Sequence, residues 1–353
     1  MKMIKKSIAT IAILIATAGF AQDSKTVFSG NADMYYRFDF ANIGDVTPVN
    51  NYTSFTNSND SFELGMASIK ASHTEGKASV VADLGFGNRA IEFTYNDKPE
   101  LFMIKQLNMT YTFSEKFKVT AGSFATHLGY ELVDAIDNKN YSMSYAFTKG
   151  PFFNTGVKAT FTSGKFNLMA GLTNPTDFKT AVAGGSRQKT VIAQAGYTAD
   201  SGSIYLNFTA GSRNPTVTSN YRQIDLVASK KLTDKFTLGF NGTFATIADD
   251  VPVAGVDDLN WMTGVVYAQY ATSASSTLAY RFEYFSDRNG ITGISINNNI
   301  VANTLSMNFK EGKFTFIPEI RFDMSTADIF IKNKDLDASK TAGSILLATT
   351  YSF

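Results

Sequence analysis

The side chains best suited to chemistry gather in one polar stretch of this 353-residue chain, between residues 122 and 156. Three carboxylates follow one another there at intervals of three, a spacing that one turn of helix would present on a single side. Grouped carboxylates create a negative potential that attracts cations and repels anions. The chemistry predicted for this stretch is electrostatic, and its candidate residues are Glu131, Asp134, Asp137, Asn138 and Lys139.

Covalent and metal chemistry have few residues to draw on. The chain contains no cysteine and only two histidines, His73 and His127. This excludes a cysteine nucleophile, thiolate zinc sites and iron–sulfur clusters, and it leaves too few ligands for a histidine-rich metal centre. His127 follows Ser123 closely, but neither histidine lies near a Gly-x-Ser-x-Gly nucleophile elbow. We expect no enzyme, no cofactor and no resident metal.

Calcium is the metal that the oxygen-rich loops of the chain could hold. The residues concerned form two groups, which are Asn57, Asn59 and Asp60, and then Asp249, Asp250, Asp257 and Asp258. We expect both groups to be solvated loops rather than ion sites, because polar loops of this composition need no metal.

A second set of charges is basic and is spread over several predicted strands. It comprises Arg37, Lys158, Arg222, Arg281 and Arg321. We expect these side chains to form a basic wall that faces the acidic stretch across a narrow, water-filled space. A solvated external loop with ordinary acidic residues is the alternative interpretation of that stretch.

The elements that would position these charges are long strands. From Phe28 to Phe40, apolar and small residues alternate strictly with mostly polar ones over thirteen positions. That is longer than the 5–6 residues typical of strands in soluble proteins. The same alternation recurs at 166–172, 204–210, 236–240, 278–284 and 345–353.

The connections between these strands fall into two length classes. Seven tight turns interleave with eight long polar stretches, among them 125–150 and 286–298, which gives about sixteen strands. An even strand number with short turns at one rim and long loops at the other is typical of a transmembrane β-barrel. We predict an all-β chain forming a single antiparallel barrel, with short periplasmic turns and long external loops. An exported soluble β-protein is the alternative.

The first 21 residues have the layout of a secretory signal peptide. Lys2, Lys5 and Lys6 precede an apolar run from Ile8 to Ala18, and Gly19-Phe20-Ala21 supplies small residues before the cleavage site. The run is too short for the ~20 residues that a membrane-spanning helix needs. We therefore expect residues 1–21 to be removed on export and residues 22–353 to form the barrel.

Composition restricts the partners. Lys and Arg total 32 against 31 Asp and Glu, and 13% of residues are aromatic. A chain with a formal net charge of only +1 is a poor nucleic-acid binder, since that affinity depends on neutralising phosphates. The aromatic and apolar content is likewise too high for a disordered chain.

Three short motifs in the polar stretch are distinctive. They are Leu128-Gly129-Tyr130-Glu131, Asp137-Asn138-Lys139-Asn140-Tyr141-Ser142, and Gly150-Pro151-Phe152-Phe153-Asn154-Thr155-Gly156-Val157. With them the chain resembles the OmpL-like β-barrel porin family, also called β-barrel porin-2. One departure is His127, at a position where proline is expected. The resemblance implies a porin of the outer membrane and no defined substrate.

The chain ends on Thr350-Tyr351-Ser352-Phe353, an alternating segment with a terminal aromatic residue. Such an ending resembles the signal that outer-membrane assembly machinery reads, which assigns that role to Tyr351 and Phe353. The expected partners are therefore outer-membrane lipid, the assembly machinery with periplasmic chaperones, and small solutes and ions. A homotrimer is left open.

The function predicted from these features is passive diffusion of small hydrophilic solutes and ions through an outer-membrane channel. Barrels of about sixteen strands leave an aqueous lumen. A substrate-specific channel, a transporter of hydrophobic solutes, and a structural or adhesive barrel remain as alternatives.

Overall fold

The computed structural model describes residues 24–42, 50–180, 188–212, 220–248, 259–294 and 296–353. The predicted signal peptide and the acidic group at 249–258 lie outside these residues. No helix in the described part of the chain is long and apolar enough to cross a bilayer.

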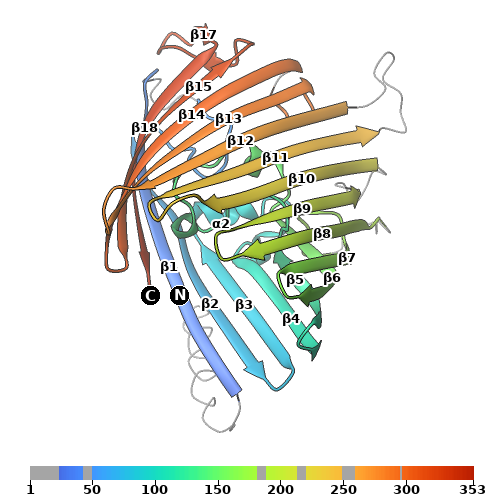
Figure 1. The fold of residues 1–353 in the computed structure, drawn as a ribbon. Coiled ribbons are helices and arrows are strands. Elements are labelled where there is room, and N and C mark those ends of the chain that lie inside the picture. Colours follow the sequence, from blue (N-terminus) through green and yellow to red (C-terminus); the bar gives the residue numbers. More distant parts are fainter. Residues whose placement is uncertain (1–23, 43–49, 181–187, 213–219, 249–258, 295) are drawn as a thin grey trace, which may run out of the picture.

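Sixteen strands close into one antiparallel barrel, which confirms the predicted fold (Figure 1). The strands are β1 (Ser24–Asp39), β2 (Ser61–Glu75), β3 (Ala78–Phe86), β4 (Ile104–Ser114), β5 (Phe117–Ala125), β6 (Phe153–Ser163), β7 (Phe166–Thr173), β8 (Thr190–Ala199), β9 (Gly202–Gly211), β10 (Asn220–Lys231), β11 (Phe236–Ala248), β12 (Leu259–Ala271), β13 (Ser276–Asn289), β14 (Ile296–Glu311), β15 (Phe314–Ser325) and β18 (Thr341–Ser352). Each strand pairs with its neighbours in the chain, and β1 pairs with β18 to close the ring.

The remaining elements are short and lie in the connections. Between β3 and β4 are α2 (Asn88–Phe93) and the 3-10 helix η1 (Pro99–Leu101), and between β5 and β6 are η2 (Ala135–Asp137) and α3 (Tyr145–Lys149). A small hairpin of β16 (Phe330–Ile331) and β17 (Ala338–Ser339) lies between β15 and β18.

Connection length separates the two rims of the barrel. The seven turns at one rim have two to four residues, whereas the connections at the other rim run from six residues (290–295) to 27 residues (126–152). One predicted loop is wrong, because 286–298 is mostly strand. The β13–β14 ladder continues to the Asn289–Ile296 pair, since backbone pairing extends beyond the last alternating apolar residue.

The alternation of side chains decides which face each residue occupies. On β13 the outward residues Tyr280, Phe282 and Tyr284 are 37–39% exposed, while the inward Arg281 and Glu283 are at most 1% exposed. An apolar outer face suits lipid and a polar inner face suits water, which is the arrangement of a transmembrane barrel. The charged residues of the inner face are therefore held where they can meet the long connection.

The rims give a prediction about topology. Cysteines placed at Ser114, the last residue of β4, and at Thr233, in a short turn, should resist a membrane-impermeant thiol reagent on intact cells, because both exposed positions lie at the rim of short turns. Cysteines at Glu100 and Asp335, both exposed in the long connections, should react. The natural chain has no cysteine, so the background is clean. Labelling in the opposite sense would place the long connections in the periplasm.

Candidate functional site

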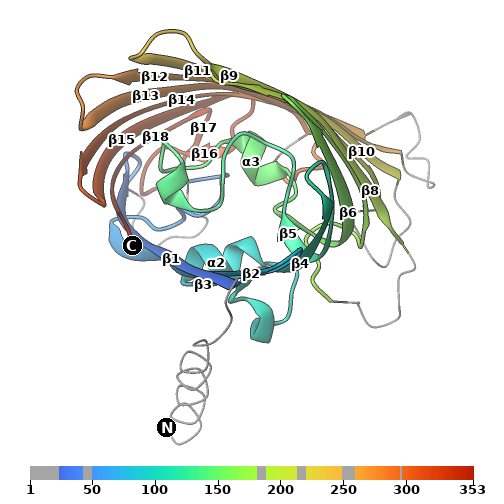
Figure 2. The same ribbon diagram turned by 60° about the horizontal axis from the view of Figure 1, so that its bottom comes forward.

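The 27-residue connection between β5 and β6 folds into the barrel. Figure 2 shows this segment, with α3, inside the ring of strands. Its residues from Asn140 to Phe147 are all buried, and Tyr141, Met143 and Tyr145 are completely so. We call residues 126–152 the inner loop. Because three of its large apolar side chains alternate with small polar ones, it buries apolar surface against the wall while its backbone remains close to charged side chains.

Charged side chains of the wall bind the backbone of the inner loop. Arg281 on β13 and Arg321 on β15 donate to the carbonyl oxygens of residues 142 and 143. The carboxylate of Glu319 accepts from the N–H groups of residues 141 and 142 at 2.7 and 3.1 Å, and Glu283 accepts from that of residue 146 at 3.2 Å. A buried loop has no ladder partners, so these side chains satisfy backbone groups that would otherwise be orphaned.

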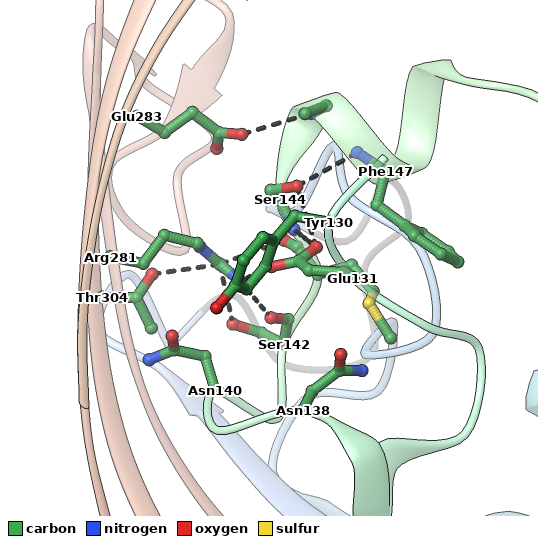
Figure 3. Close-up of polar contacts among 12 residues, drawn as sticks. Tyr130, Glu131, Asn138, Asn140, Ser142, Ser144, Phe147, Arg281, Glu283 and Thr304 are labelled. Carbon is green, nitrogen blue, oxygen red and sulfur yellow. Dashed lines mark hydrogen bonds and ion pairs between the residues drawn. The ribbon is translucent and has the colours of Figure 1, made fainter. Parts of the chain in front are cut away.

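Glu131 connects the inner loop to the wall (Figure 3). Its Oε1 lies 2.7 Å from Nη1 of Arg281, and its Oε2 accepts from the N–H and the hydroxyl of Ser144, both at 2.8 Å. Ser144 in turn caps the first turn of α3 by accepting from the N–H of Phe147. Glu131 is thus buried and fully engaged, so it acts as a tether rather than as a charge exposed to a passing ion.

Asp134 reaches the opposite side of the lumen. Its carboxylate lies 2.7 Å from Nζ of Lys105 on β4, which also pairs with Asp83 at 3.0 Å. The hypothesis that Glu131, Asp134 and Asp137 share one helical face is therefore wrong. The 3-10 helix η2 covers only residues 135–137 and does not include the two earlier acids.

The last three candidates of the stretch differ in exposure. The side chain of Asn138 bonds to both the N–H and the carbonyl of Leu132, so it closes a turn. Asp137 and Lys139 are exposed and border a cavity of about 270 Å³ together with Tyr130 and Gln269. Partial desolvation inside the barrel raises the pKa of Asp137, with a contribution from neighbouring Asp134, and lowers the pKa of Lys139.

Three of the predicted basic residues face the lumen beside carboxylates. Arg37 lies 3.1 Å from Asp39, and Arg321 lies 2.8 Å from Asp323, while Arg281 pairs with Glu131. Charges of opposite sign are therefore in contact and not opposed across a gap. Lys158 also points inward, where its Nζ lies 4.1 Å from the ring centre of Phe124.

Arg222 does not belong to the wall, which corrects the prediction. On β10 the buried, inward residues are Tyr221, Gln223 and Asp225, and the oxygen of Asp225 accepts from the inner loop. Arg222 lies on the other phase with Ile224, and both are exposed on the outer face. The sequence held the signal that would have placed it, because polar Gln223 and Asp225 alternate with apolar Ile224 and Leu226, and Arg222 shares the apolar phase.

Two functional cations were missed by the sequence reasoning. Arg89 on α2 is buried, with its guanidinium 4.9 Å from the ring centres of both Phe55 and Tyr141 and 3.7 Å from Asp33. Nothing in its local sequence distinguishes it from a loop arginine. Lys105 was hidden because a register shift beside Asp83 interrupts the alternation of β3 and β4.

Aromatic side chains pack where the connections enter the barrel. Phe55, Phe93, Phe147 and Phe152 form one cluster with ring centres 5.2–5.8 Å apart. A second cluster joins Tyr145 of the inner loop to wall residues that include Trp261 and Phe285. The lumen is therefore partly apolar toward the rim of long connections.

Open space remains on one side of the inner loop. A cavity of about 860 Å³ lies between this loop and inward side chains of the neighbouring strands, and Phe93, Phe147 and Phe152 also border it. Its lining includes Ser203, Ser229 and Ser352 at the ends of strands, so it reaches the rim of short turns. Polar and charged residues of its lining include Lys70, Gln106, Asp137, Gln194 and Tyr205.

His127 also borders this cavity but is poorly suited to proton transfer. Its Nε2 lies 3.0 Å from the carbonyl oxygen of Phe208, and its Nδ1 has no partner within the described residues. Burial lowers the pKa of His127 to about 4, so the ring is neutral at pH 7. The hydroxyl of Ser123 makes no hydrogen bond to it or to another described residue.

The C-terminal residue lies at the seam of the barrel. Phe353 and Gly30 exchange two backbone hydrogen bonds, of 2.9 and 3.1 Å. The Phe353 ring covers Gly30, where a Cβ atom would lie only 2.2 Å from it. Tyr351 and Phe353 both point outward and are at least half exposed, so they are available at the surface of the folded barrel.

Comparison with known proteins places this geometry among channels. Residues 25–353 match the sequence profile of the family described as "putative beta-barrel porin-2, OmpL-like". No curated protein sequence matches the chain.

Solved structures share its fold at low sequence identity. The outer-membrane channel DcaP of Acinetobacter baumannii is 10% identical with a TM-score of 0.63, over 95% of this chain and 100% of its own. An anion-selective porin from Comamonas acidovorans is 11% identical with a TM-score of 0.62, over 94% and 100%. The trimer form of OmpT of Vibrio cholerae is 10% identical with a TM-score of 0.59, over 94% and 100%.

Proposed function

Since the chain belongs to the putative beta-barrel porin-2, OmpL-like family and is an outer-membrane porin, we propose that small hydrophilic solutes and ions diffuse passively past its inner loop. The observation that carries this proposal is the cavity of about 860 Å³ that lies beside the loop and reaches the rim of short turns. Its lining offers hydroxyl, amide and charged groups, which suit hydrated solutes.

The inner loop would set the width of the path. Its backbone is bound by charged side chains of β13 and β15 on one side, and Asp134 reaches Lys105 on the other. A segment held at both sides cannot move aside easily, so the remaining space has a defined size. In this proposal the constriction consists of Glu131, Asp134, Asp137, Asn138 and Lys139, but their roles differ.

Ion preference would come from the charges that lack a close partner. Glu131 and Asp134 are paired, and paired charges largely cancel beyond a short distance. Asp137 and Lys139 are exposed and form no ion pair within the described residues, and Lys70 borders the cavity of about 860 Å³ together with Asp137. We infer a modest preference that depends on salt concentration, because exposed charges are screened over ~10 Å at 0.1 M salt.

Asp137 therefore offers a direct test. Changing Asp137 to Asn should shift the reversal potential in a planar bilayer toward anions, with little change in conductance. The shift should shrink in concentrated electrolyte as screening increases. Asp335→Asn is the matched control, because Asp335 is exposed in the connection that carries β16 and β17. An equal reversal potential in wild type and Asp137→Asn would place Asp137 away from the ion path.

An aromatic border favours one other candidate function, a channel that prefers solutes with an apolar part. Phe93, Phe147 and Phe152 line the same cavity as the polar groups. Such a channel would show current block by aromatic solutes at concentrations where sugars of similar size have no effect. A channel for general diffusion would respond to the size of the solute alone.

The role of the chain is proposed to be passage rather than catalysis. His127 is neutral at pH 7 because burial lowers its pKa to about 4, and Ser123 does not bond to it. A serine nucleophile needs an adjacent general base.

Outer-membrane lipid surrounds the barrel, and further partners are proposed. Assembly machinery would read Tyr351 and Phe353, both of which are exposed at the seam. A homotrimer is supported only by the trimer form of the similarly folded OmpT. Small solutes and ions are the remaining proposed partners.

A further inference from the structure

The outer face of the barrel carries an apolar groove over β5 to β9. It encloses about 490 Å³. Its floor is made by Ala159 on β6, Ala170 on β7 and Ala193 on β8, which lie side by side in the registers of these strands. Small side chains in adjacent positions leave a depression in a face that elsewhere carries exposed Phe, Leu and Tyr.

Larger side chains form the walls of this groove. Phe117, Phe161, Leu168 and Leu206 border one side, and Phe208 on β9 closes one end, directly beside Ala193 in the strand register. The first four belong to one row that crosses β5, β6, β7, β8 and β9 in register through Ala195. The groove therefore follows a row of residues across the strands and is long and narrow rather than round.

Two cations lie beyond Phe208 and Ala193, in the direction of the rim of long connections. Arg222 on β10 pairs with Ala210 on β9, which lies two residues beyond Phe208 along that strand. Ala210 also pairs with Val191 on β8, which lies two residues from Ala193. One step of two residues along a strand covers about 6.7 Å. Lys189 lies a further step beyond Val191, directly before β8, and it is exposed.

The position of Arg222 on the lipid side of the barrel needs an explanation. A charged residue on this face is costly at the bilayer midplane and costs little near the interface. Arg222 is the third residue of β10, at the rim of long connections, where an interface is expected. Within the described residues Arg222 has no carboxylate partner.

We propose that this groove and the two cations bind a lipid of the outer leaflet through its phosphate headgroup and one acyl chain. The acyl chain lies along the alanine floor, and Arg222 and Lys189 bind the phosphate. Arginine suits this role because its guanidinium binds phosphate through two parallel hydrogen bonds. The charge complementarity at one end of the groove favours a phosphorylated lipid over a second copy of the chain as the occupant.

The test measures retention of lipid by the folded, full-length barrel in detergent, using native mass spectrometry. The probes are lipid A, a phosphorylated lipid of the outer leaflet, and the same lipid after removal of its phosphates. The double variant Arg222→Gln/Lys189→Gln should weaken retention of lipid A at least about tenfold, the size expected for losing hydrogen bonds between charged groups. Retention of the dephosphorylated lipid should not change.

The groove itself is tested by Ala193→Phe, which fills its floor and should weaken retention of both lipids. Arg288→Gln and Ala67→Phe are the matched controls, because Arg288 is an exposed cation at the long-connection end of β13 and Ala67 is an exposed alanine on β2. Heat-modifiable mobility in gels verifies that each variant is folded. Arg222→Lys should restore part of the retention.

Three outcomes would overturn the proposal. One is wild-type retention of lipid A by the double variant. Another is an equal loss of both lipids in that variant, which would remove the role of the phosphate. The third is a change in oligomeric state for Ala193→Phe with unaltered lipid retention, which would identify a second copy as the occupant of the groove.

Discussion

Removal of residues 131–147 is expected to raise the single-channel conductance of this porin severalfold. These residues occupy lumen volume that water and ions would otherwise fill, and Tyr141, Met143 and Tyr145 are completely buried there. Conductance rises with the open cross-section, and a barrel of sixteen strands has an aqueous interior once it is not filled by protein. Single-channel recording in a planar bilayer measures the change directly.

A deletion in another connection controls for a general disturbance. Residues 333–337 lie between β16 and β17, and most of them are exposed, so removing them should leave conductance near that of the wild type. Heat-modifiable mobility would verify that both variants are folded. If the deletion of 131–147 folds and conducts like the wild type, the inner loop does not limit the path.

Replacement of Arg281 by Met should release the inner loop without shortening it. The Arg281 and Glu131 side chains are 0% and 4% exposed, and Arg281 also binds the carbonyl oxygens of Ser142 and Met143. Removing one partner of a buried pair costs about 3–5 kcal/mol, because the remaining charge is buried without compensation. The loop should then become sensitive to protease, and the channel current should become noisy.

A double variant separates the lost pair from the lost packing. In Arg281→Met/Glu131→Gln the uncompensated charge is absent, so part of the protease resistance should return. The matched control is Lys231→Met, since the Lys231–Asp234 pair lies at the surface with side chains 52% and 98% exposed. Exposed pairs contribute little. Equal protease resistance in Arg281→Met and wild type would show that the other wall contacts suffice to hold the loop.

Both predictions rest on the way in which the charges of the lumen are arranged. Arg37, Arg281 and Arg321 each lie beside a carboxylate and also bind backbone carbonyls, as at Asn50, Ser142 and Met143. They therefore position the connections that enter the barrel. The charges left to act on a passing ion are fewer than the sequence suggests.

The fold of this protein follows closely from local sequence. From Phe28 to Phe40 the period of two forces one phase outward and the other inward, whatever else the chain does. Short turns such as 76–77 and 164–165 require neighbouring strands to be antiparallel, because so few residues cannot return a strand to the other rim. The number of strands was therefore predicted correctly from the alternation and the turns, whereas the family was predicted from the resemblance of three short motifs. The extent of the loop at 286–298 was predicted wrongly, because the backbone pairing of β13 and β14 continues beyond the last alternating apolar residue.

The arrangement of the site was decided by the tertiary structure. Glu131 and Asp134 are three residues apart, yet they reach Arg281 on β13 and Lys105 on β4, because the loop between them crosses the lumen. Arg89 became a central contact of that loop, with its guanidinium 4.9 Å from the ring centre of Tyr141. In both cases the outcome depends on which residues the closed barrel brings together. Periodicity acts between adjacent residues and determines which side chains of the wall face inward. The partners of a charge in the lumen come from strands that are far apart in the chain, so they are set only when the ring closes.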